Sequence, residues 1–243
     1  FSLGKHLMAR RLLDIVALEQ ELEELNRFIS HKEEQPLVHK IHVYPARFLP
    51  QIPRAFVTHL TSPGELVLDP MVGAGTTVEV ALEEGRRAIG LDINPISPLV
   101  AGFLHMACFD TEQDAQLGFY QEVVSKAFDN SEAEGVALPE RAEFHNWKLW
   151  FRPEVLRELL LLRQYIDRCS DPLVRRFLKL ALSRICKPVS NADPRDLFPQ
   201  RDQENLVRPR ENVCTHMLAS IDKLRALVEA IPEEAYHLSL IHI

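Results

Sequence analysis

Residues 65–77 read Glu65-Leu-Val-Leu-Asp69-Pro70-Met-Val-Gly73-Ala-Gly75-Thr76-Thr77. The apolar run that ends at Asp69 has the composition of a buried parallel strand. The glycines after it allow the backbone to approach a ligand closely, and the helix expected from Thr76 to about Glu84 offers free N–H groups to a carboxylate or phosphate. The segment therefore predicts a strand, a ligand-binding turn and a helix, in that order.

A second apolar strand is expected at residues 88–92, and Asn94-Pro95 is a start signal for another helix. Strand, helix and strand at this spacing form a βαβ unit, which predicts an α/β fold with a doubly wound parallel sheet. Asp92 ends the second strand, where an acid can accept hydrogen bonds from both ribose hydroxyls of an adenosine ligand. The alternative is a structural turn with a capping residue.

Two common phosphate-binding motifs are excluded by single positions. A dinucleotide fingerprint requires glycine where the chain has Val78, and no Gly-Lys-Ser/Thr follows the turn as a Walker loop requires. The ligand is therefore expected to be a nucleoside of another kind.

The flanking sequence is mainly helical. Residues 12–29 repeat apolar side chains at steps of three and four, as in an amphipathic helix that either docks on its own chain or forms a coiled coil. From residue 111 onwards strand signals vanish, and Pro153 and Pro172 suit the first turns of helices. We expect an N-terminal helical region at 1–38, a ligand-binding core at 39–110, a mainly helical segment at 111–237 and a separate tail at 238–243.

Composition limits the class of protein. The chain has 243 residues, of which 46% are hydrophobic, and its four cysteines include no CxxC pair. Because no apolar run reaches the ~18–20 residues of a membrane span, we expect a cytoplasmic protein with reduced thiols and no membrane attachment. His39 and His42 have no neighbouring acid or cysteine in sequence, so loop roles are expected for them and no metal site.

Positive charge is concentrated in one segment. The net charge is −7, yet residues 145–210 hold fourteen Lys and Arg against eight Asp and Glu. Such a segment either faces nucleic-acid phosphate or is a solvated helix face. The residues expected to contact DNA phosphates are Arg175, Arg176, Lys179, Arg184 and Lys187. Trp147 and Trp150 either stack on bases or pack this segment on the core.

Three motifs in order resemble one family. The pattern Asp69-Pro70-x-x-Gly73-x-Gly75-Thr76-Thr77 resembles the cofactor motif of bacterial DNA amino-methyltransferases, of the cytosine-N4 and adenine-N6 type. The stretch Gly90-Leu-Asp92-Ile-Asn94-Pro95 is similar to their second motif, and His42-Val-Tyr44-Pro45-Ala-Arg47-Phe48 resembles the segment before the first. The resemblance covers roughly His39 to Leu99, under a third of the chain.

The resemblance implies a Rossmann-like methyltransferase core, incomplete in this chain, that binds S-adenosylmethionine. By the resemblance, Asp69, Gly73 and Gly75 border the methionine moiety, Thr76 and Thr77 lie at its carboxylate, Asp92 holds the ribose, and Phe48 packs near the methionine or adenine portion. With two further motif positions, the expected cofactor-binding residues are Phe48, Asp69, Pro70, Gly73, Gly75, Thr76, Thr77, Asp92 and Asn94. Double-stranded DNA and a restriction-modification partner are the implied partners.

One departure from the family matters. Its catalytic motif is an Asp/Asn/Ser-Pro-Pro-Tyr/Phe/Trp tetrapeptide that grips the flipped base, and this chain contains no Pro-Pro pair. Asn191-Ala-Asp193-Pro194-Arg195 is the nearest pattern. The catalytic residues are therefore unknown, and we expect cofactor binding without turnover. The alternatives are a non-catalytic S-adenosylmethionine-binding module that recognises DNA or a protein, and a methyltransferase acting on RNA or protein.

The chain is also expected to be a fragment. It begins at Phe1 without methionine, and Leu238-Ser-Leu-Ile-His-Ile243 matches a translated sequencing adapter. We therefore expect residues 238–243 to be non-native and the natural protein to continue past residue 237.

Overall fold

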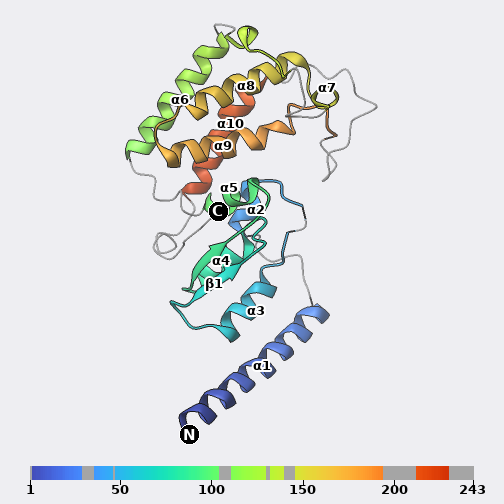
Figure 1. The fold of residues 1–243 in the computed structure, drawn as a ribbon, viewed down its shortest axis with the longest axis vertical. Coiled ribbons are helices and arrows are strands. Elements are labelled where there is room, and N and C mark those ends of the chain that lie inside the picture. The colour runs from blue at the N-terminus through green and yellow to red at the C-terminus, as the bar shows by residue number, and fades with distance from the viewer. Residues whose placement is uncertain are drawn as a thin grey trace. The chain divides into compact units, whose positions relative to one another are not determined.

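The computed structural model describes residues 2–28, 36–45, 47–103, 111–129, 132–139, 146–193 and 212–229. These residues form two compact units, divided after Ala107, which we call unit 1 and unit 2 (Figure 1). The expected tail at 238–243 lies outside the described residues, as does most of the polar loop from Asn191 to Pro209.

Unit 1 contains the expected βαβ unit. Strand β1 (Leu66–Asp69) pairs in parallel with β2 (Arg87–Gly90), with Leu66 opposite Arg87 and Asp69 opposite Gly90. Helix α4 (Thr76–Glu83) connects the strands, packs against both, and is followed by Gly85 in the left-handed conformation expected of a C-terminal cap. The strand–turn–helix–strand prediction is confirmed, with element bounds that differ by one or two residues.

The burial expected for β1 is wrong within the described residues. Leu66 and Leu68 are 46% and 58% exposed, although their composition is that of a strand covered on both faces. The described sheet has two strands, and α4 packs on them. Apolar composition reports which surface a strand is able to bury, but it does not supply the element that covers it. The described sheet is therefore a small parallel one with a bare apolar face.

The remaining helices of unit 1 support this core. They are α1 (Ser2–Phe28), α2 (Leu37–Ile41), α3 (Gln51–Leu60) and α5 (Ile96–Ala101). Helix α1 docks on α3, with Leu18 buried and the Glu21 carboxylate 2.7 Å from His59 Nε2. Of the two alternatives for the amphipathic helix, docking on its own chain is the one observed. Arg54 of α3 pairs with Glu83 and Glu84 at the end of α4.

Unit 2 is helical. It comprises α6 (Thr111–Asp129), the 3₁₀ helix η2 (Glu132–Gly135), α7 (Trp147–Trp150), α8 (Pro153–Asp167), α9 (Pro172–Cys186) and α10 (Val213–Val228). Helices α8 and α9 begin at the two expected prolines. Its centre is filled by fully buried side chains, including Leu162, Phe177, Leu180, Met217 and Ile221.

Candidate nucleoside-binding site

The turn after β1 needs glycine at two positions. Gly73 and Gly75 have φ of 51° and 93°, in the left-handed region. A Cβ on Gly75 would also lie 2.9 Å from the Cα of Ala101 in α5. The turn is closed by Gly75 N–H donating to the Val72 carbonyl at 2.8 Å, while Asp69 Oδ1 accepts from Met71 N–H at 3.0 Å. Gly75 thus serves packing as well as backbone conformation.

The two motif turns meet through Asp92. Its Oδ2 accepts from Gly73 N–H and its Oδ1 from Asn94 N–H, both at 2.8 Å. The Asn94 N–H bond is the largest cause that lowers the pKa of Asp92, assisted by Gly73 N–H and the Ser97 side chain. Asp92 is therefore an ionised carboxylate, bonded to the turn that follows the neighbouring strand.

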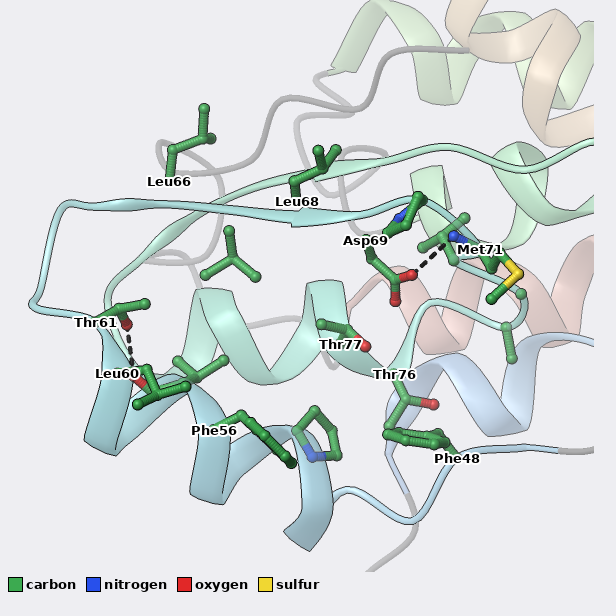
Figure 2. A pocket seen from close by; sticks show the side chains of 17 residues that line it. Phe48, Phe56, Leu60, Thr61, Leu66, Leu68, Asp69, Met71, Thr76 and Thr77 are labelled. Atoms are coloured by element: carbon green, nitrogen blue, oxygen red, sulfur yellow. Dashed lines mark hydrogen bonds between the residues drawn. The ribbon is translucent and has the colours of Figure 1, made fainter. Parts of the chain in front are cut away.

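A pocket of about 600 Å³ lies beside this turn (Figure 2). Its volume is in the range of small-molecule sites. Six of the nine residues expected to bind cofactor line it: Phe48, Asp69, Pro70, Gly73, Thr76 and Thr77. Gly75, Asp92 and Asn94 are not among the lining residues, but Asp92 bonds directly to Gly73 at its rim.

The apolar wall of the pocket was not expected from the sequence. Figure 2 shows Phe56 and Leu60 on α3, on one side of β1, and the side chains of Leu66 and Leu68 on the side of that strand turned away from α3. All four residues line the pocket. Phe56 is 43% exposed and Leu60 52%. The sequence signal for this wall is the short amphipathic helix between Pro50 and Thr61. The helix buries Pro53, Ala55 and Val57 and leaves further apolar side chains exposed.

Helix α4 begins without a side-chain cap. Its N-cap is Gly75, and the first backbone bond that returns to this residue comes from Glu79 N–H. The N–H groups of Thr76, Thr77 and Val78 therefore have no acceptor within the helix. With the partial positive charge of a helix N-terminus, this end suits a carboxylate.

Two side chains that the sequence analysis did not assign to the site support this helix. His39 lies in α2 and is buried, with Nε2 2.8 Å from Thr76 Oγ1, so the expected loop role is wrong. Burial, assisted by the charge of Arg47, lowers the pKa of His39 from 6.5 to about 4, so the ring is neutral near pH 7. Glu79 accepts from Leu37 N–H and Val38 N–H at 2.6 and 2.9 Å, and burial raises its pKa. Both contacts fix α2 against α4.

The cations expected to contact DNA lie on α9 and at its end, and they differ in burial and in their bonding partners. Arg175 Nη1 donates to the Cys169 carbonyl at 3.3 Å, and Lys179 pairs with Asp167 at 3.2 Å. Arg176 and Arg184 are half-buried, and burial lowers the pKa of both, while Lys187 is also half-buried. They do not form one uniformly exposed basic face.

One of the two tryptophans of the basic segment packs inward. Trp147 is buried and its indole N–H donates to the Pro139 carbonyl at 3.2 Å, which favours the packing alternative for this residue. In the part of the chain that the structure describes, no three His, Cys, Asp or Glu side chains are grouped to hold a metal ion. No helix of that part is long and apolar enough to cross a membrane.

Comparisons with known proteins agree with the motifs. Residues 17–96 match a family model described as DNA methylase. The chain is 38% identical over 73 residues to the type II methyltransferase M.MjaII of Methanocaldococcus jannaschii, which is 30% of this chain and 14% of that protein. It is 22% identical over 179 residues to the type II methyltransferase M.MvaI of Kocuria varians, which is 72% of this chain and 39% of that protein. The resemblance to DNA amino-methyltransferases is therefore confirmed.

The extent of these matches is informative. The chain spans 14% and 39% of the two relatives' lengths, so it corresponds to part of each. An alignment of 179 residues exceeds unit 1, which is residues 1–107 with 231–243, so the similarity to M.MvaI reaches into unit 2. No solved structure matches the chain.

Proposed function

We propose that this chain is the S-adenosylmethionine-binding part of a DNA methyltransferase that modifies an exocyclic amine of cytosine or adenine. The observation that carries the proposal is the bond between Gly73 N–H and Asp92, which joins the two motif turns beside a pocket of suitable size. The family match over residues 17–96 includes both turns.

The donors and acceptors at the site fit the proposed cofactor. The uncapped start of α4 at Thr76 and Thr77 suits its carboxylate, and Asp69 at the pocket wall suits its ammonium group. Asp92, with an ionised carboxylate, accepts hydrogen bonds from ribose hydroxyls, and Phe48 supplies apolar contact. The bound cofactor would supply an electrophilic methyl group; these residues bind and orient it. Gly75 and Asn94 act indirectly, through helix packing and the Asp92 turn.

Transfer itself is not assigned to these residues. The family's catalytic tetrapeptide has no counterpart among the 243 residues, because the sequence holds no Pro-Pro pair. The proposal is therefore cofactor binding without methyl transfer by this polypeptide alone. The same observation favours a second candidate, a non-catalytic cofactor-binding module. Methyl transfer to DNA by a longer natural form would favour the enzyme over the module.

The proposal extends to fold and partners. In a doubly wound fold, helices pack on both faces of the sheet, and helices on the second face would cover the exposed Leu66 and Leu68. Double-stranded DNA is the proposed substrate, residues 111–237 the proposed recognition region, and a restriction-modification enzyme a proposed partner in the cytoplasm. On α9, Lys179 is the exposed phosphate contact, whereas Arg175, Arg176 and Arg184 are half-buried.

Calorimetry tests the cofactor assignment. S-adenosylmethionine should bind the chain, and Asp92→Ala should weaken binding about ten- to a hundredfold, because a hydrogen bond to a charged group contributes about 1.5–3 kcal/mol. Asp222→Ala is the matched control, because this exposed aspartate of α10 lies in unit 2 and bonds to Gln121. Absence of binding, or equal affinity in both variants and the parent, would refute the proposal.

A further inference from the structure

Tyr44 contacts both motif turns at once. Its ring covers the glycine turn, since a Cβ on Gly73 would lie 3.4 Å from Tyr44 Cε1. Its hydroxyl lies 2.9 Å from Ser97 Oγ, in the first turn of α5. The segment before β1 is thereby attached to the turn after β1 and to the turn after β2.

Asn94 connects Tyr44 to Asp92. Asn94 Oδ1 accepts from Ile96 N–H at 3.1 Å, which leaves its Nδ2 to donate to the Tyr44 hydroxyl at 3.4 Å. The backbone N–H of the same Asn94 donates to Asp92 Oδ1 at 2.8 Å. The Tyr44 hydroxyl is thus held by Ser97 and by Asn94, and Asn94 bonds directly to Asp92.

The carboxylate of Asp92 also accepts from Gly73 N–H. Tyr44 therefore acts on both sides of the Gly73–Asp92 bond: its ring packs on Gly73, and its hydroxyl reaches Asp92 through Asn94. The backbone N–H groups of Gly73 and Asn94 each occupy one lone pair on a different oxygen of Asp92, which fixes the rotation of the carboxylate. The remaining lone pairs are those that a ribose would use.

We propose that Tyr44 is a positioning residue that orients the Asp92 carboxylate toward the ribose hydroxyls of a bound nucleoside. The inference rests on the proposed function, because it presupposes that Asp92 binds a ribose. It assigns to the Tyr44 hydroxyl a role in ligand selectivity that the ring alone does not have.

The test measures coupling between the Tyr44 hydroxyl and the ribose hydroxyls. S-adenosylhomocysteine and its 2′,3′-dideoxy analogue are titrated into the 243-residue chain and into Tyr44→Phe. In the parent, loss of the ribose hydroxyls should weaken binding on the order of tenfold or more. In Tyr44→Phe this ratio should fall to about threefold or less, because the carboxylate is no longer oriented.

Two further variants define the pathway. Ser97→Ala should lower the same ratio, and the double variant should lower it no further than either single variant, since both remove the bond that holds the Tyr44 hydroxyl at Ser97. Tyr165→Phe, on α8 of unit 2, should keep the parental ratio.

An unchanged ratio in Tyr44→Phe, or equal weakening of both ligands, would overturn the inference, because the residue would then only shape the turn. A parent that binds S-adenosylhomocysteine and its dideoxy analogue equally well would instead refute the ribose assignment of Asp92, and the inference with it.

Discussion

Helices α9 and α10 of unit 2 differ from α4 of unit 1 in how the N–H groups of their first turns are satisfied. In unit 2, Asp171 accepts from Leu173 N–H and Val174 N–H at the start of α9, and Asn212 accepts from Thr215 N–H at the start of α10. In unit 1, α4 starts at Gly75, which has no side chain to offer. These caps satisfy helix N–H groups within unit 2 itself. Helix α8 of that unit also begins without a side-chain cap, at Pro153, but α4 keeps donors available beside a pocket, which supports the proposal that unit 1 binds a small ligand.

Replacing glycine should have opposite effects in the two units, and this is the largest expected difference. Gly75→Ala introduces a left-handed alanine and a clash with Ala101, which together should destabilise unit 1 by about 2–5 kcal/mol. Gly118→Ala, in α6 of unit 2 with no atom within 4 Å of its Cβ position, should stabilise that helix by about 0.5–1 kcal/mol. Hydrogen exchange resolved by peptide measures both. Equal protection of β1, α4 and β2 in Gly75→Ala and the parent would contradict the packing role.

A second expected effect is a pH dependence confined to unit 1. The pKa of His39 is lowered from 6.5 to about 4 on folding, so its contribution is present above about pH 6.5 and is lost as the pH falls through 4. Complete loss would amount to about 3 kcal/mol. Glu79 acts in the opposite sense, since its pKa is raised and its contribution is lost as the pH rises.

His39→Gln isolates the histidine. Thermal unfolding of unit 1 should depend less on pH between 7 and 4 in this variant than in the parent. Parallel pH profiles for the two proteins would show that the ring near Thr76 is not held neutral.

The capping difference predicts a smaller effect. Asp171→Ala removes the acceptor at the start of α9 and should destabilise unit 2 by about 1 kcal/mol, without changing S-adenosylmethionine affinity. Urea unfolding, followed by the fluorescence of Trp147 and Trp150 in unit 2, measures the loss of stability. A weakened cofactor affinity would show that ligand binding is not confined to unit 1.

The smallest effect concerns Lys179. The Lys179 side chain, which pairs with Asp167, is 43% exposed. Because exposed ion pairs contribute little, Lys179→Ala should change stability by less than about 1 kcal/mol. If α9 contacts DNA phosphate, the slope of log affinity against log salt should fall by about one. An unchanged slope would identify Lys179 as a solvated residue.

The two turns of the candidate site were predictable from sequence, because their geometry depends on local backbone conformation. Gly73 and Gly75 are required because few other residues adopt their φ, and Asp92 follows a strand whose neighbour ends at the same edge. Short sequence patterns encode such local constraints directly. The positions of Tyr44 and His39 depend instead on contacts between segments about thirty to fifty residues apart in sequence, to Ser97 and Thr76. Spacing along the chain does not report those contacts.

The basic segment shows the opposite limit. Counting charges identified the basic segment at 145–210. The count does not indicate which of its side chains are half-buried, as Arg176 and Arg184 are. The exposure of β1 was missed for a related reason, because the covering element is not part of the strand's own pattern.

The most direct test is hydrogen exchange of the chain with and without saturating S-adenosylhomocysteine. Ligand should slow exchange in peptides covering residues 69–78 and 90–97, the two turns joined by Gly73 and Asp92, and leave α8 and α9 unchanged. Protection confined to α8 and α9, or saturation of a tight complex with neither turn protected, would contradict the assignment of the cofactor to this edge of the sheet.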